Sequence, residues 1–330
     1  GYGEWENTSL FIMIKRTFIL LLFISLYTSL FAGSFLHLNV REGLSSRQVY
    51  QICKDSTGFI WAYTHMGVDR YDGNEIRHYK LNETIDSKDH ILSFTVMEID
   101  KEGNLWIALR NGRIYRYDKL KDCFELQVDL SQSISFPVLN GIEFEENEGL
   151  WLSTSTGVYY WNRTDNVLSP AGLIGEWTNC IIKSAENTFF VGTNTEVYKM
   201  ERAGTTCQLS KEKVDIPVEA RIEALFLYGT KLYVGTFSNS AFVIDLATKQ
   251  VKSLDSFIPG IPVRVFAHDG DHSILIGADG AGVFRIDAAN ETLTEHYITD
   301  EDDERSLNGN TVSDICVDEY GGIWVSPCTN

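Results

Sequence analysis

The sequence is poor in positive charge. Its 28 Lys and Arg residues stand against 46 Asp and Glu residues, which gives a formal net charge of −18. A general basic surface for nucleic acid is therefore absent, and binding to anionic polymers without a local basic patch is disfavoured. We expect no nucleic-acid binding by this chain.

Cysteine is also scarce, and the cysteines are far apart. The wide, irregular spacing contains no C-x-x-C pair, which argues against a zinc site and against a small secreted disulfide scaffold. We expect these side chains to be buried as small apolar residues, with one incidental disulfide as the alternative. The six are Cys53, Cys123, Cys180, Cys207, Cys316 and Cys328.

Signatures of catalysis are missing as well. The seven histidines are scattered, no cluster of metal-ligating residue types stands out, and the nucleophile motif G-x-S-x-G is absent. We therefore predict no metal, no cofactor and no catalytic residue, and we expect that the chain is not an enzyme. No segment after residue 34 has a long helical period, which excludes an α/β fold.

One apolar stretch lies near the start of the chain. Lys15 and Arg16 follow Met13 and precede an apolar run over 18–32, after which small residues occur. This order is typical of a secretory signal, and the run of about 15 residues is short for a membrane span, which needs roughly 20. The alternatives are a buried helix and an uncleaved anchor. We expect 1–34 to hold upstream residues and the signal peptide, and the remainder to be exported.

A sequence pattern recurs about every 44 residues after the signal. "GFIWAYTHMGVDRYD" (58–72) is echoed by "GNLWIALRNGRIYRYD" (103–118) and "GLWLSTSTGVYYWN" (149–162), and weaker copies follow. Each unit reads as four short strands separated by Gly and Asp clusters, which is typical of a β-propeller blade and not of a β-sandwich. The seven anchor positions are Trp61, Trp106, Trp151, Phe190, Tyr233, Leu275 and Trp324.

The predicted fold is an all-β, seven-bladed β-propeller over 35–330 with an incomplete last blade. We expect 34–40 to supply an outer strand to that blade, which leaves it at about three strands with an open edge prone to self-association. The repeat units lie near 43–80, 91–128, 138–168, 177–209, 220–254, 263–297 and 308–330.

The short stretch ahead of the best-preserved anchors contains an acid and a glycine. An aspartic-protease loop or a sialidase Asp-box would space these residues differently, so we predict a structural turn. Asp at the first position and Gly at the fourth fit a type I turn followed by a glycine at positive φ. The three copies are Asp55, Gly58 and Trp61; Asp100, Gly103 and Trp106; and Asp318, Gly321 and Trp324.

These repeats resemble the two-component regulator propeller repeat. The resemblance rests on "GLSSRQVYQICKDSTGFIWAYTHMGVDRYDGNEIRHY" (43–79) and "SLNGNTVSDICVDEYGGIWV" (306–325). It implies the periplasmic sensor of a Bacteroides-type hybrid two-component histidine kinase, in which two propellers precede a membrane helix, a kinase core and a DNA-binding regulator. Such proteins detect oligosaccharides and regulate polysaccharide utilisation. The kinase motifs do not occur in this chain, which resembles the first propeller.

The resemblance also implies localisation and partners. We expect a periplasmic location, with the full-length parent in the inner membrane and self-associated. Membrane contact would then come only through further C-terminal parts. Two rival functions stay open: an exported propeller enzyme, either a polysaccharide lyase or a glycosidase, and a scaffold propeller that binds proteins.

Propellers bind ligands on the loops that join second to third strands and on the connections between blades. Aromatic rings together with amides, carboxylates and guanidinium groups are suited to an oligosaccharide ligand. The alternative is ordinary polar loop surface. The candidate ligand-binding residues are Tyr63, His65, Arg110, Asn111, Asn194, Phe237, Asn239 and Asp279.

Overall fold

The computed structural model describes residues 34–81, 96–130, 138–145, 149–204 and 206–328. The predicted signal peptide lies outside the described residues apart from Ser34. Residue contacts divide the chain into two compact units, Gly1–Leu36 with Asp300–Ser306, and His37–Thr299 with Leu307–Asn330. The second unit holds every strand, and the described residues contain no helix. None of them therefore forms a helix long and apolar enough to cross a membrane.

Each of the first six repeats folds into a four-stranded antiparallel sheet, or blade, with its strands in chain order. Blades 1 and 2 comprise β1 (Val49–Lys54), β2 (Ile60–Thr64), β3 (Gly67–Tyr71), β4 (Ile76–Tyr79), β5 (Val96–Ile99), β6 (Leu105–Ala108), β7 (Arg113–Asp118) and β8 (Cys123–Asp129). Blades 3 and 4 comprise β9 (Leu139–Glu145), β10 (Gly149–Thr154), β11 (Gly157–Asn162), β12 (Val167–Gly172), β13 (Thr178–Ala185), β14 (Thr188–Thr193), β15 (Val197–Arg202) and β16 (Leu209–Val214).

The remaining repeats continue the same order. Blades 5 and 6 comprise β17 (Ile222–Tyr228), β18 (Lys231–Thr236), β19 (Ala241–Asp245), β20 (Val251–Ser253), β21 (Val263–Asp269), β22 (Ser273–Ala278), β23 (Gly282–Asp287) and β24 (Leu293–Tyr297). The last sheet has two strands, β25 (Thr311–Val317) and β26 (Ile323–Cys328).

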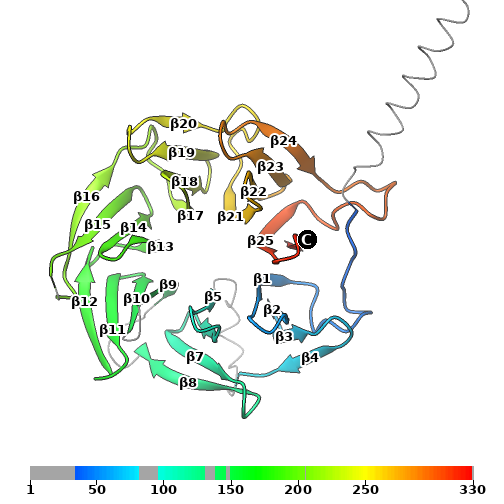
Figure 1. Ribbon diagram of the computed structural model, residues 1–330, viewed down its shortest axis with the longest axis horizontal. Helices are drawn as coiled ribbons and strands as arrows, with labels where there is room; N and C mark the ends of the chain where they lie inside the picture. The colour runs from blue at the N-terminus through cyan, green and yellow to red at the C-terminus, as the bar shows by residue number, and fades with distance from the viewer. Residues whose placement is uncertain (1–33, 82–95, 131–137, 146–148, 205, 329–330) are drawn as a thin grey trace, which may run out of the picture. The chain divides into compact units, whose positions relative to one another are not determined.

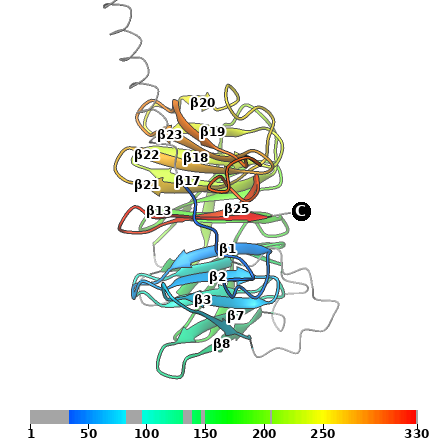
Figure 2. The ribbon, with the colours of Figure 1, turned by 90° about the vertical axis from the view of Figure 1, so that its right-hand side faces the viewer.

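The strands of the second unit form a ring. The first strand of every sheet is innermost, and β1, β5, β9, β13, β17, β21 and β25 each contact the next, with β25 returning to β1 (Figure 1). A side view shows β1 and β25 as neighbours (Figure 2). The prediction of an all-β propeller is therefore confirmed.

The number of blades differs from the predicted seven. The described residues form six four-stranded blades, and the seventh repeat contributes a two-stranded sheet. The prediction that 34–40 adds a strand to this sheet is wrong, because no strand forms there. The backbone N–H of Leu44 instead donates to the Asn39 carbonyl at 3.2 Å, and that of Arg41 donates to Asn39 Oδ1 at 2.8 Å. These bonds form a turn over 39–44, at the end of that segment.

The seven anchors occupy equivalent places, one on the second strand of each sheet. Trp61 pairs with Cys53 of the inner strand, and Trp106 pairs with Glu98 in the same register. The first six anchors are 0–3% exposed, and five of them, all but Leu275, belong to the hydrophobic clusters between blades. Bulky second-strand side chains therefore account for the repeating pattern.

The acid ahead of three anchors has two structural roles. The N–H of Gly58, at φ 93°, donates to the Asp55 carbonyl at 3.0 Å, which closes the expected turn. Asp55 Oδ2 also accepts a hydrogen bond from Trp61 Nε1 at 2.8 Å, and Asp100 accepts from Trp106 in the same way. The carboxylate thus joins the turn to the buried indole, and sequence reasoning recognised only the turn.

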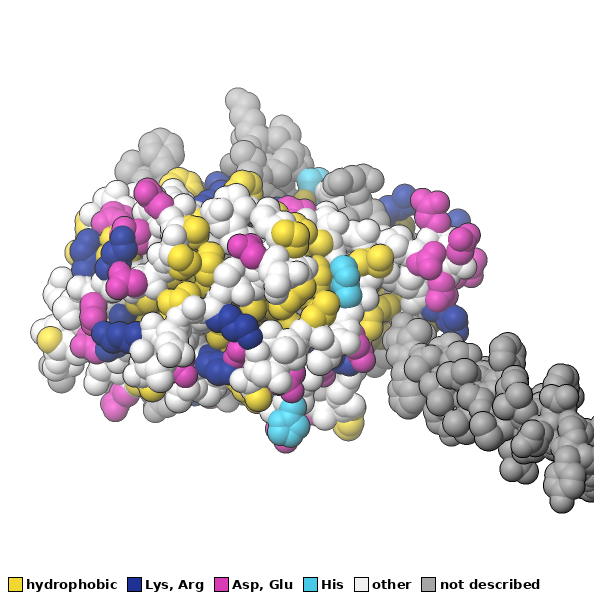
Figure 3. Space-filling model, turned by 90° about the horizontal axis from the view of Figure 1, so that it is seen from above, with side chains coloured by type: hydrophobic (Ala, Val, Ile, Leu, Met, Phe, Trp, Pro, Cys, Tyr) yellow, Lys and Arg dark blue, Asp and Glu magenta, His cyan; other side chains and the backbone are white. Residues whose placement is uncertain are grey.

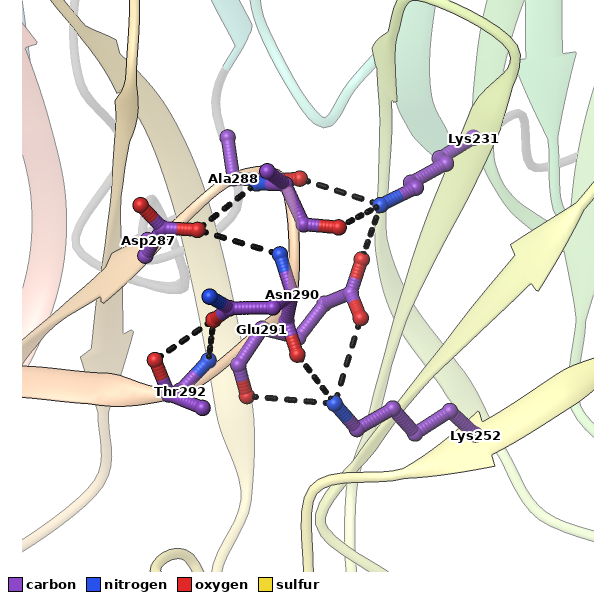
Figure 4. Close-up of polar contacts among 8 residues, drawn as sticks. Lys231, Lys252, Asp287, Ala288, Asn290, Glu291 and Thr292 are labelled. Carbon is purple, nitrogen blue, oxygen red and sulfur yellow. Dashed lines mark hydrogen bonds and ion pairs between the residues drawn. The ribbon is translucent and has the colours of Figure 1, made fainter.

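Blades 5 and 6 are joined at their periphery by a buried carboxylate. Glu291, in the loop between β23 and β24, has a side chain 9% exposed and forms ion pairs with Lys231 of β18 and Lys252 of β20 (Figure 4). Lys231 also donates to the carbonyls of Ala288 and Ala289, at 3.0 and 2.8 Å. Two lysines of one blade therefore hold a loop of the next.

Candidate functional site

One end of the ring carries the loops between second and third strands, and we call this end the loop face. In blades 1, 3, 5 and 6 this loop lies against the segment that leads into the inner strand of its own blade. The N–H of His65 donates to Gln48 at 3.1 Å, and that of Phe237 donates to Arg221 at 2.9 Å. The loops and the connections between blades therefore form one surface, as expected.

Seven of the eight predicted ligand residues lie on the loop face. His65, Arg110, Asn111, Asn239 and Asp279 are partly exposed, while Asn194 and Phe237 are exposed. Tyr63 does not belong to this face. It lies within β2, which extends to Thr64, and at 1% exposure its ring packs in the core between blades.

Blades 4 and 5 bring several of these side chains together with others that sequence reasoning missed. Asn179 Nδ2 donates to Asn194 Oδ1 at 3.1 Å, and the Arg221 guanidinium lies 5.5 Å from the centre of the Phe237 ring. The two pairs are adjacent, because the N–H of Ala220 donates to the Thr195 carbonyl at 3.2 Å.

Trp177 completes this arrangement. It is 36% exposed and immediately precedes β13, two residues before Asn179. We call Trp177, Asn179, Asn194, Arg221 and Phe237 the blade 4–5 group. Sequence reasoning missed three of these residues, Trp177, Asn179 and Arg221. All three lie at or just before the start of an inner strand, and searching the connections between blades for such side chains could have identified them.

The blade 4–5 group offers the contacts that carbohydrates use. Two exposed aromatic rings provide flat apolar faces, and the amides and the guanidinium provide planar hydrogen-bonding groups. Arg221 Nε lies 2.8 Å from Glu223 Oε1, so the guanidinium is oriented by a carboxylate at the start of β17. These features favour binding of a polar ligand with apolar faces.

Positive charge from other blades lies near this group. Burial lowers the pKa of Arg110, on the loop between β6 and β7, and the charge of Arg221 lowers it further. Arg264 pairs with Asp279 at 2.5 Å. Burial raises the pKa of Asp279, but the hydrogen bond and the charge of Arg264 outweigh this and bring it below its usual value. Figure 3 shows that charges of both signs are interspersed with apolar side chains around the outer edge of the ring.

Carboxylates gather along the inner strands. Desolvation of Glu98 on β5, together with the charges of Asp314 and Glu143, raises its pKa to about 8. Burial raises the pKa of Asp314 to about 7 and also raises that of Glu143. Asp314 accepts the N–H of Ile52 at 2.9 Å, and Glu143 accepts that of Lys183 at 3.0 Å. Both thus link neighbouring inner strands.

The raised pKa of Asp314 predicts a pH-dependent stability. A carboxyl with a raised pKa in the folded state contributes full stability only below its unfolded pKa, and this contribution is lost as the pH rises toward 7. We expect Asp314→Asn to match the wild type at pH 4, where the Asp side chain is also neutral. At pH 8 the variant should be more stable by about 1–2 kcal/mol, a value reduced for partial exposure.

Urea unfolding between pH 4 and 8 measures this difference. Asp255→Asn, at an exposed loop position, is the matched control and should show no such trend. If the free energies of unfolding of Asp314→Asn and the wild type differ by a constant amount from pH 4 to 8, the prediction is wrong and the Asp314 carboxylate is well solvated or well paired.

A cavity of about 200 Å³ lies between blades 2 and 3 at the first-to-second-strand turns, and its lining includes Lys101, Glu145 and Arg163. Glu145 accepts from Trp151 Nε1 at 2.6 Å and pairs with Arg202 at 2.7 Å, while Arg163 lies over the Trp106 ring. These contacts stabilise the blades.

Within the described ranges no three His, Cys, Asp or Glu side chains are grouped to hold a metal ion. Free thiols are found at Cys53, Cys123, Cys180, Cys207 and Cys316.

One family and several solved structures are similar to this chain. Residues 306–327 match the family described as two component regulator propeller. No curated protein matches the chain. The fold is similar to the extracellular domain of the putative hybrid two component system BT4673 from B. thetaiotaomicron (TM-score 0.70, 22% identity), and 89% of this chain aligns with 38% of that structure.

Two further solved structures share the fold. The extracellular domain of the putative hybrid two component system BT3049 from B. thetaiotaomicron aligns with a TM-score of 0.71 at 18% identity, over 89% of this chain and 40% of its own. PorZ, a surface component of the type-IX secretion system of Porphyromonas gingivalis, aligns with a TM-score of 0.66 at 13% identity, over 88% and 47%. The chain therefore spans less than half the length of each structure.

Proposed function

We propose that this chain is the N-terminal sensor propeller of an exported hybrid two-component signalling protein, and that its loop face binds an oligosaccharide. The observation that carries the signalling role is the match of 306–327 to the regulator propeller family. The shared fold of extracellular domains of putative hybrid two component systems supports it. Such domains lie outside the cytoplasmic membrane, so the proposed location is periplasmic.

The proposed ligand site is the blade 4–5 group. The exposed rings of Trp177 and Phe237 accompany an amide pair on blade 4 and a guanidinium on blade 5, and a backbone hydrogen bond from Ala220 to Thr195 joins the two blades. Because the site draws on two blades, ligand binding would stabilise their packing and communicate with the rest of the ring. In this proposal the propeller binds its ligand without converting it.

The inner-strand carboxylates of Glu98, Glu143 and Asp314 favour one rival function, an exported propeller enzyme, because raised pKa values are common in catalytic acids. Asp314 and Glu143, however, accept backbone N–H groups of the neighbouring inner strand. A carboxylate that already joins two blades has a structural reason for its position. We therefore assign these two residues to ring closure.

An oligosaccharide array tests the proposed function. The chain should bind a defined subset of neutral or acidic plant and host oligosaccharides and leave them uncleaved, as checked by mass spectrometry of the recovered sugars. Trp177→Ala, which removes an exposed ring, should weaken binding about tenfold while leaving the melting temperature unchanged. No binding would contradict the sensor proposal, and cleavage would favour the enzyme.

A further inference from the structure

Arg221 has hydrogen-bonding capacity that its contacts do not use. Its side chain is 42% exposed, and its Nε lies 2.8 Å from Glu223 Oε1. That oxygen receives no aligned hydrogen bond. The two terminal nitrogens of Arg221 have no hydrogen-bond partner within the part of the chain that the structure describes. The guanidinium is therefore held on one side and open on the other.

The neighbours of Arg221 hold this open group in place. The Phe237 ring lies beneath the guanidinium at 5.5 Å, and Phe237 N–H donates to the Arg221 carbonyl at 2.9 Å. Glu223 is 10% exposed, so its contact with Nε is anchored in the wall of blade 5. A stacked and laterally paired guanidinium loses little conformational freedom when it binds a ligand.

The local charge favours an anion at this place. Arg110 of blade 2 lies near enough to Arg221 for the two charges to repel each other, although the blades are not adjacent in the ring. An anionic group bound to Arg221 would weaken this repulsion. A neutral sugar would leave it in place.

We propose that the oligosaccharide ligand is acidic, and that its carboxylate or sulfate group binds the terminal nitrogens of Arg221 while its sugar rings lie against Phe237 and Trp177. This inference rests on the proposed function and specifies its ligand class. A guanidinium presents two parallel N–H donors that match the two oxygens of a carboxylate or sulfate. Asn194 and Asn179 provide amide groups for neighbouring hydroxyls.

Matched pairs of oligosaccharides test the acidic class by calorimetry. Tetragalacturonate is compared with its fully methyl-esterified form, and a κ-carrageenan oligosaccharide with its desulfated form. The charged member of at least one pair should bind about tenfold or more tightly than its neutral partner, since a charge-assisted bidentate contact is stronger than a neutral hydrogen bond. The first pair identifies a carboxylate source and the second a sulfate source. Affinity should fall as salt rises.

Two substitutions of Arg221 separate charge from geometry. Arg221→Gln should abolish the preference for the charged member, and Arg221→Lys should restore it only in part because lysine lacks the planar fork. Arg77→Gln is the matched control, because Arg77 is 59% exposed on β4 and its removal changes the net charge equally. It should leave the preference intact. Melting temperatures verify that each variant is folded.

The outcomes distinguish the two proposals. Binding of neutral oligosaccharides with equal or higher affinity would overturn the acidic class and leave the sensor function standing. A charge preference that persists in Arg221→Gln would overturn the role of Arg221. Failure of every charged and neutral oligosaccharide to bind would overturn both proposals together.

Discussion

Replacing Trp106 by alanine is expected to lower the free energy of unfolding by about 3–5 kcal/mol. The indole is 0% exposed and packs between blades 2 and 3, in a cluster that includes Leu139 and Leu152. The substitution leaves a cavity and removes the donor to Asp100 Oδ2. Burial raises the pKa of Asp100, and the hydrogen bonds, led by that of Trp106, bring it below its usual value. The variant should therefore lose less of its remaining stability than the wild type does as the pH falls from neutral.

Urea unfolding followed by circular dichroism measures this loss. Trp177→Ala is the matched control, since the same atoms are removed from a ring that is 36% exposed. It should change the unfolding midpoint little. Trp106→Phe, which keeps most of the volume, should lie between the two. Equal effects of Trp106→Ala and Trp177→Ala would contradict the assignment of the repeating aromatics to the core between blades.

Replacing Lys231 by methionine is expected to destabilise the protein by about 2–4 kcal/mol. Removing one partner of a buried ion pair leaves the other charge uncompensated. Glu291 is 9% exposed, and after the substitution it keeps only Lys252, which is 50% exposed. The carbonyls of Ala288 and Ala289 lose their donor as well (Figure 4).

A double substitution separates the orphaned charge from the lost packing. Lys231→Met combined with Glu291→Gln should be more stable than Lys231→Met alone, because no buried charge remains. Lys213→Met is the surface control, since its ion pair with Glu196 lies on exposed strand β16 and contributes little. Additive effects of Lys231→Met and Glu291→Gln would show that the two side chains do not stabilise each other.

The fold was largely readable from local patterns. The second strands carry a run of apolar residues in every repeat, as in "FIWAY" and "NLWIA", because both faces of these strands are covered by neighbouring blades. The turn ahead of them needs a glycine at positive φ, and Gly58, Gly103 and Gly321 supply it. Such signals lie within a few residues of each other, so sequence alone reveals them.

Two expectations failed because their outcome depends on contacts distant in sequence. Tyr63 was expected in a loop, but pairing with β1 and β3 extends β2 through Thr64 and turns the ring into the core. The segment 34–40 has an alternating apolar pattern, yet Asn39 and its neighbours close a turn instead of a strand. Whether a segment forms a strand depends on whether the edge strand of a sheet lies beside it and can pair with it.

By itself the sequence determined the repeat, the positions of the strands and the turns between them, because these follow from side-chain periodicity and from backbone preferences of single residues. Only the tertiary structure decided which side chains meet across blades. Arg110 and Arg221 are more than 100 residues apart, and Glu98 and Asp314 more than 200, yet ring closure brings each pair within interaction range. Such groupings arise from the curvature of the whole ring, which no short stretch of the chain encodes.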